Sequence, residues 1–189
     1  APDVGILNLY WVKDFAMNNW IQPLDQLIEP ETKADFFDGF LDYASYDGKL
    51  YGLFTETGVA TVLYRKDLFA EAGVNPPELL EAWDFDEFTA AAKKLTKDVD
   101  GDGKNDVWGI GVSGSRTGGG GPTTFTQFPF FWSLGGELID KDGYPAFDSE
   151  AGRASLQLYH DLVHEYEVAP RESYSYTWDD IARGFSAGQ

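Results

Sequence analysis

The clearest helix start in the chain reads Trp83-Asp84-Phe85-Asp86-Glu87-Phe88. The Asp84 carboxylate can accept a hydrogen bond from the backbone amide of Glu87, and the Glu87 side chain can accept one from the amide of Asp84. Lysines at 93, 94 and 97 suit the negative end of a helix dipole. The spacing therefore predicts a helix that begins after Asp84 and ends near Lys97.

Signals for strands and further helices lie on both sides of this segment. Upstream we expect a strand over 4–7, a short helix over 11–18, a hairpin at Asp47-Gly48, a β-rich segment over 59–64 and a helix over 66–72 closed by Gly73. Downstream we expect a strand over 107–110, a helix over 149–166 and a final helix opened by Trp178. The alternation predicts an α/β protein. Because nothing precedes the first strand and no strand follows the last helix, we expect a piece of a larger protein.

Composition excludes several classes of function. The 189 residues carry a formal net charge of −18, which argues against binding to nucleic acid or to an anionic membrane through a basic face. Cysteine is absent, which excludes disulfides, thiolate metal sites and a thiol nucleophile. Aromatic residues make up 16% of the chain, and such a proportion suits a surface that stacks on ring-shaped ligands.

A series of short stretches, ordered along nearly the whole chain, carries a family resemblance. They are Pro2–Val4, Trp11–Val12, Ile21–Asp25, Asp47–Leu53, Leu63–Phe69, Ala82–Phe88, Lys93–Thr96, Leu134–Asp140, Trp178–Phe185 and Gly188–Gln189. Together they resemble the extracellular solute-binding proteins of ABC importers, in the sugar-binding group of the maltose-binding protein family. The resemblance implies a periplasmic-binding-protein-like fold of two α/β lobes joined by a hinge, incomplete at both ends. Residues 1–57 would be a remnant of the first lobe and 58–189 most of the second.

The resemblance also implies a function. A receptor of this kind holds a neutral sugar or oligosaccharide in the cleft between its lobes and delivers it to the membrane permease of an ABC transporter. It is not an enzyme, needs no cofactor and does not bind nucleic acid. We therefore expect a periplasmic or extracellular protein, with or without a lipid anchor.

Neutral sugars present hydroxyls and apolar ring faces, so their sites combine aromatic platforms with carboxylates, amides and hydroxyls. The resemblance places ligand contacts after the first strand, at the hinge and in the second lobe. The candidates are Asn8, Tyr10, Trp11, Glu56, Thr57, Arg116, Phe125 and Trp132. Each has a structural alternative: Trp11 can pack at a helix start, Glu56 can hold the hinge, and Arg116 can be a solvated loop residue. Trp178 is expected mainly in the core.

The segment from Asp98 to Asp106 resembles the start of a calcium loop. Its candidate ligands are Asp98, Asp100, Asp102 and Asp106, with glycines at the turn. The twelfth position of such a loop, which needs a bidentate Glu, is Gly109. The pattern therefore favours an acidic turn between a helix and a strand, and a weak calcium site remains an alternative.

Two other functions are alternatives to the receptor. A glycoside hydrolase would need two carboxylates at a separation of about 5–9 Å, and no motif supports that arrangement. A calcium-stabilised structural module would rest on the acidic turn alone. The His160–His164 segment matches the zinc-protease spacing, but Asp161 replaces the general-base Glu and both histidines fall outside the apolar stripe of their helix.

Overall fold

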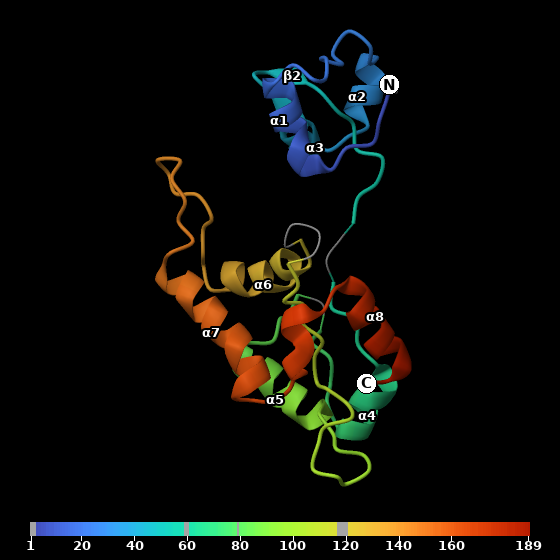
Figure 1. The fold of residues 1–189 in the computed structure, drawn as a ribbon, viewed down its shortest axis with the longest axis vertical. Helices are drawn as coiled ribbons and strands as arrows, with labels where there is room; N and C mark the ends of the chain where they lie inside the picture. Colours follow the sequence, from blue (N-terminus) through green and yellow to red (C-terminus); the bar gives the residue numbers. More distant parts are fainter. Residues whose placement is uncertain (1–2, 59–60, 79, 117–120) are drawn as a thin grey trace. The chain divides into compact units, whose positions relative to one another are not determined.

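The computed structural model describes residues 3–58, 61–78, 80–116 and 121–189. The chain divides into two compact units, Ala1–Val59 (unit 1) and Ala60–Gln189 (unit 2), coloured blue to cyan and green to red in Figure 1. The described residues are rich in helix, and their hydrogen-bonded sheet is a two-stranded hairpin in unit 1.

Unit 1 combines short helices with this hairpin. Its elements are η1 (Leu9–Trp11), α1 (Val12–Met17), α2 (Pro30–Ala34), α3 (Asp38–Tyr43), β1 (Ser45–Tyr46) and β2 (Lys49–Leu50). The expected turn at Asp47-Gly48 is confirmed: both residues have positive φ, 49° and 70°, which matches the tight turns that suit antiparallel strands. Leu50 is buried, and its amide donates to Asp25 Oδ2 at 3.0 Å.

The expected strand over 4–7 is not formed. These residues are irregular, and Val4 and Ile6 are 88% and 89% exposed. A strand is stable only when a neighbouring strand takes up its backbone hydrogen bonds. Within the described part of unit 1, the hairpin pairs only with itself, so apolar sequence alone does not make this segment a strand.

Unit 2 holds most of the helix. Its elements are α4 (Lys66–Ala72), α5 (Phe85–Leu95), α6 (Gly121–Ser133), α7 (Glu150–His164), η2 (Arg171–Ser175) and α8 (Trp178–Ala187). The predicted helix start at Asp84 is confirmed, because Glu87 N donates to Asp84 Oδ1 at 2.8 Å and Asp84 N donates to Glu87 Oε2 at 3.0 Å. The predicted helix end at Gly73 is also confirmed, with φ of 63°.

The core of unit 2 lies where α5 and α7 meet an extended segment that includes Val112. Its buried residues are Ala92, Val112, Leu162, Val163, Val168 and Ala169. Residues 110–115 are extended and bond along the segment after α7: Ile110 N donates to Val168 O at 3.1 Å and Gly114 N to Ser173 O at 2.7 Å. The expected strand over 107–110 is reduced to a single bridge between Lys97 and Val107. The described part of the β-rich segment, 61–64, is irregular, and residues 59 and 60 lie outside the description.

Helices α6 and α7 pack together (Figure 1). Phe131 of α6 is fully buried, and Gln127 Nε2 donates to Ser155 Oγ of α7 at 2.8 Å. Among the described residues, no helix is long and apolar enough to cross a membrane.

Candidate functional site

Three candidate ligand residues of unit 1 belong to η1 or its N-cap. Asn8 Oδ1 accepts a hydrogen bond from Tyr10 N at 3.1 Å and so caps the element. Tyr10 and Trp11 are each 53% exposed. Trp11 stacks on Phe15 with ring centroids 6.2 Å apart and planes 8° from parallel. Trp11 is therefore held by packing and still presents aromatic surface to solvent.

The two hinge candidates, Glu56 and Thr57, are exposed in an irregular segment that leads out of unit 1. A carboxylate and a hydroxyl there can accept hydrogen bonds from sugar hydroxyls. The described structure gives each unit separately, so the role of this segment as a hinge stays a prediction.

Phe125 of α6 and Trp178 of α8 form an exposed aromatic pair in unit 2. Their ring centroids lie 6.0 Å apart, with planes inclined at 55°. Phe125 is 48% exposed and Trp178 is 47% exposed. The assignment of Trp178 to the core is therefore wrong. It opens α8, and the start of a surface helix leaves half of its ring in solvent.

Trp132 continues this surface along α6. It lies seven residues after Phe125, which places it on the same side of the helix about 10 Å further along the axis. Trp132 is 55% exposed and meets Phe128 edge to face at 5.5 Å. Arg116 is exposed immediately before residues 117–120, which lie outside the description. Phe125, Trp178 and Trp132 are named the aromatic platform from here on.

Polar contacts anchor α6 to a neighbouring segment and cap the start of α8, the two helices that carry the platform. Thr123 Oγ1 donates to Ser115 O at 2.9 Å, and Thr126 Oγ1 donates to Ser113 O at 3.2 Å, which ties the start of α6 to the extended segment. At α8, Thr177 N donates to Asp180 Oδ2 at 2.8 Å. The backbone and side-chain hydrogen bonds from Thr177 keep the pKa of Asp180 below its usual value, so the Asp180 carboxylate that accepts them stays ionised.

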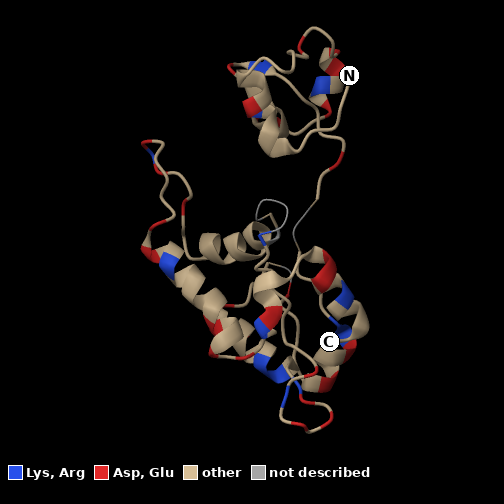
Figure 2. Ribbon diagram, viewed as in Figure 1, with Lys and Arg blue, Asp and Glu red and all other residues tan. Residues whose placement is uncertain are grey.

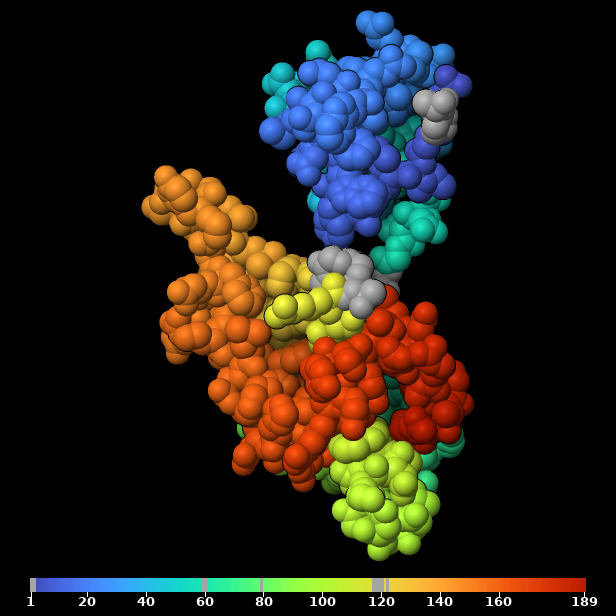
Figure 3. Space-filling model, viewed as in Figure 1, coloured from blue at the N-terminus to red at the C-terminus, as the bar shows by residue number. Residues whose placement is uncertain are grey.

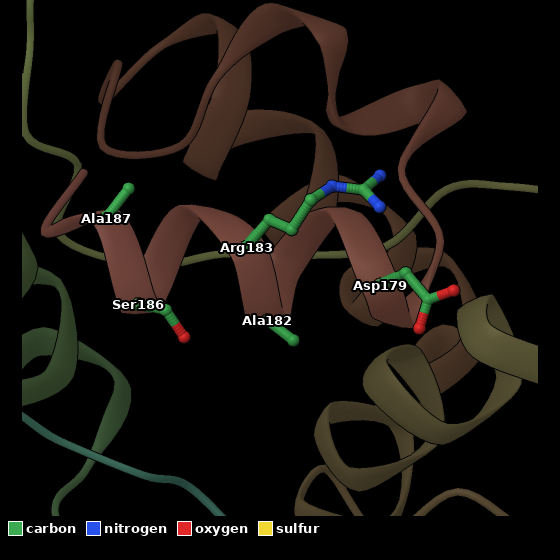
Figure 4. A pocket seen from close by; sticks show the side chains of 5 residues that line it. All are labelled: Asp179, Ala182, Arg183, Ser186 and Ala187. Atoms are coloured by element: carbon green, nitrogen blue, oxygen red, sulfur yellow. The ribbon is translucent and has the colours of Figure 1, made fainter.

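Two shallow hollows contain none of the predicted ligand residues. One lies on the outer face of α8 and is lined by Asp179, Ala182, Arg183, Ser186 and Ala187 (Figure 4). All five side chains come from a single helix, so this hollow offers no converging groups. The other, in unit 1, is almost entirely apolar and is lined by Leu9, Phe37, Gly39, Phe40, Tyr43 and Phe54. Neither combines aromatic faces with polar groups as a sugar site requires.

The acidic loop after α5 gathers three of its four candidate metal ligands. Carboxylate oxygens of Asp98, Asp100 and Asp106 lie within 4.8 Å of one another. Asp102 is not part of this cluster, and its carboxylate lies 3.3 Å from Lys104 Nζ. The loop protrudes from unit 2 (yellow-green in Figure 3), and its acidic residues are the red stretches of ribbon beyond α5 in Figure 2.

Gly109 explains why the loop departs from a calcium-binding loop at its twelfth position. A Cβ at this residue would lie 2.1 Å from the carbonyl oxygen of Ala92 in α5. The helix backbone therefore leaves no room for any side chain, and least of all for a bidentate Glu.

Comparison with known proteins identifies the family. The family model for bacterial extracellular solute-binding proteins matches residues 1–189. A Brucella abortus binding protein is 29% identical over 188 residues, covering 99% of this chain and 42% of that protein. The arabinooligosaccharide-binding protein of Bacillus subtilis is 33% identical over 172 residues, covering 90% of this chain and 36% of that protein.

Solved structures agree. An ABC transporter solute-binding protein from Thermotoga lettingae, bound with alpha-D-tagatose, has a TM-score of 0.72 and 30% identity, covering 90% of this chain and 41% of that one. A Listeria monocytogenes ABC substrate-binding protein in complex with cycloalternan has a TM-score of 0.69 and 26% identity, covering 97% of this chain and 44% of that one. The expected two-lobe fold class is confirmed, and the chain spans about two fifths of the length of these relatives.

Proposed function

The chain belongs to the bacterial extracellular solute-binding protein family, and on that premise we propose that the protein captures a neutral sugar or oligosaccharide for an ABC importer. The observation that carries the proposal is the half-exposed pair Phe125 and Trp178. Aromatic faces of this kind stack on the apolar faces of sugar rings. The Bacillus subtilis relative is named for an arabinooligosaccharide, which is consistent with this ligand class.

The aromatic platform favours a ligand of more than one ring. Trp132 and Phe125 are two helical turns apart on one side of α6, so a single monosaccharide would not cover both. Asn8, Tyr10, Trp11, Glu56 and Thr57 from unit 1, together with Arg116, would supply polar contacts to the hydroxyls. We assign residues 1–57 to the first lobe and 58–189 to the second.

Charge favours a neutral ligand. Among the candidate ligand residues, Arg116 is the one cation and Glu56 the one anion, and the whole chain carries a net charge of −18. A phosphate or dicarboxylate would need several converging donors. The proposed partners are therefore a neutral sugar and the ABC transporter permease that receives it, outside the cytoplasmic membrane. The protein binds its ligand and releases it unchanged.

Calorimetry of the full-length protein against a panel of monosaccharides and oligosaccharides tests the proposal. We expect micromolar or tighter binding, about −8 kcal/mol or better, to at least one neutral sugar, which is recovered intact. Phe125→Ala and Trp178→Ala should each weaken binding by about tenfold or more, or 1.4 kcal/mol. Tyr144→Ala is the matched control, because Tyr144 is 69% exposed in the same unit but outside the platform. Preference for a phosphorylated ligand, cleavage of the sugar, or equal effects of all three variants would contradict the proposal.

A further inference from the structure

The outer face of α7 carries both histidines of the chain, His160 and His164, one helical turn apart. Their ring centroids are 4.6 Å apart, with planes inclined at 39°. The His160 side chain is 59% exposed, and His164 is also exposed. Leu162 and Val163 are buried in the core instead. The expected position of the histidines outside the apolar stripe is confirmed.

Asp161 determines which nitrogen of His160 is free. His160 Nδ1 lies 3.1 Å from Asp161 Oδ1, and Gln157 Nε2 donates to the same oxygen at 2.7 Å. An aspartate carboxylate is ionised at neutral pH, and an ionised carboxylate can only accept hydrogen bonds. Nδ1 of His160 must therefore carry the proton, and in the neutral ring Nε2 keeps its lone pair. A carboxylate behind an imidazole is the arrangement that orients histidine ligands at metal sites.

We propose that His160 and His164 together bind a divalent transition-metal ion of the imidazole-preferring class, Cu²⁺, Ni²⁺ or Zn²⁺. Residues four apart on a helix are neighbours on one side, so both imidazoles can reach the same ion. The adjacent carboxylates of Asp161 and Glu165, and the net charge of −18, favour the approach of a cation.

The number of protein ligands defines the character of this site. Within the described ranges, the one group of three side chains whose ligand atoms lie close enough to share a metal ion is Asp98, Asp100 and Asp106. An ion on α7 therefore takes two ligands from the chain and water at its other positions. Binding is reversible and exchangeable, unlike that of a closed structural metal site. Calcium and magnesium prefer oxygen ligands and should not compete for the histidines.

Calorimetric titration of the full-length, untagged protein with each ion separately tests the site, with excess calcium present to occupy the acidic loop. We expect one ion per chain at this site, with Cu²⁺ the tightest of the three. The second imidazole acts as an intramolecular ligand, so His160→Ala or His164→Ala should weaken binding by about tenfold or more. The matched control is the double variant His164→Ala with Glu165→His. It keeps two histidines but places them five residues apart, on different sides of the helix, and should bind as weakly as the single variants.

Asp161→Asn tests the positioning role of the carboxylate. Affinity should fall about tenfold, since a carboxylate that orients a histidine ligand contributes about that much at comparable sites. The ¹⁵N shifts of the His160 ring should also report loss of the single tautomer, an effect that a purely structural role of Asp161 would not produce. Equal metal affinity in the native protein and the double variant would overturn the proposal, as would binding that responds only to substitution of Asp98, Asp100 or Asp106.

Discussion

Gly109→Ala should destabilise unit 2 strongly because residue 109 touches the backbone of α5. A Cβ there would lie 2.1 Å from Ala92 O and 2.6 Å from Ala92 C. Ordinary van der Waals contact starts at 3.4 Å, which is 1.3 Å beyond the distance that the native backbone leaves to the oxygen. Both obstructing atoms belong to the main chain of a helix, so no side-chain rotation can relieve the overlap.

The cost has two parts. Overpacking of a rigid contact costs about 1–3 kcal/mol. The segment must also withdraw from α5, which lengthens the hydrogen bond of 3.0 Å from Gly109 N to Thr96 Oγ1 and forfeits about 0.5–1.5 kcal/mol. We therefore expect a loss of about 1.5–4.5 kcal/mol in the free energy of unfolding, or a fall in Tm of about 3–18 °C.

Urea and thermal unfolding, followed by circular dichroism, measure this loss. Gly121→Ala is the matched control: it lies in the same unit, its φ is not positive and a Cβ there would meet no atom within 4 Å. The control should stay within about 0.5 kcal/mol of the native protein. If Gly109→Ala were as stable as Gly121→Ala, the close approach of residue 109 to α5 would be refuted.

Three further predictions concern the cap of α5, an exposed ion pair and the acidic loop. Asp84→Ala removes the side-chain acceptor of the capping hydrogen bond from Glu87 N and should cost about 0.5–2 kcal/mol in urea unfolding, whereas Asp84→Asn should recover most of the loss. The bidentate hydrogen bonds from Arg65 lower the pKa of Asp67 to about 2. The stabilising contribution of this pair is therefore fully present at pH values above the usual pKa of aspartate and is lost as the pH falls towards 2. An NMR titration of the Asp67 carboxyl should find a higher midpoint in Arg65→Ala than in the native protein. Calcium should bind the acidic loop only at about millimolar concentration, because position 109 is a glycine and offers no bidentate carboxylate. Millimolar calcium should therefore raise Tm slightly, and this rise should disappear in Asp100→Ala. Sub-micromolar binding would contradict the prediction.

Elements with a local cause could be predicted from the sequence. The reciprocal bonds of Asp84 and Glu87, the left-handed Gly73 and the turn at Asp47-Gly48 depend on neighbours a few residues away. The expected strands depend on distant partners to receive their hydrogen bonds, so apolar runs such as 4–7 could not settle their own structure.

Helix α6 was not predicted, for a different reason. Pro129 lies in its interior and cannot donate a backbone hydrogen bond, which counts against a helix in any local assessment. Contacts with the extended segment and α7 stabilise α6 instead. The exposure of Trp178 and the position of Asp102 outside the carboxylate cluster likewise depend on the tertiary structure. Residue types indicated an aromatic site and an acidic site, but which residues belong to each depends on the tertiary structure.

Different residues of α6 hold the helix in place and form its exposed surface. Ser113 O accepts hydrogen bonds from Thr126 and from the partly buried Tyr159, and burial raises the pKa of Tyr159, so its phenol keeps the proton that it donates. Gln127 and Ser155 add a buried link to α7. The register of α6 is thus set by directional bonds on its inner side, whereas apolar packing alone would tolerate sliding. Its outer residues, Phe125 and Trp132 among them, can change identity without moving the backbone. A lineage could alter which ligand it recognises by substitutions confined to that outer side, at little cost to folding.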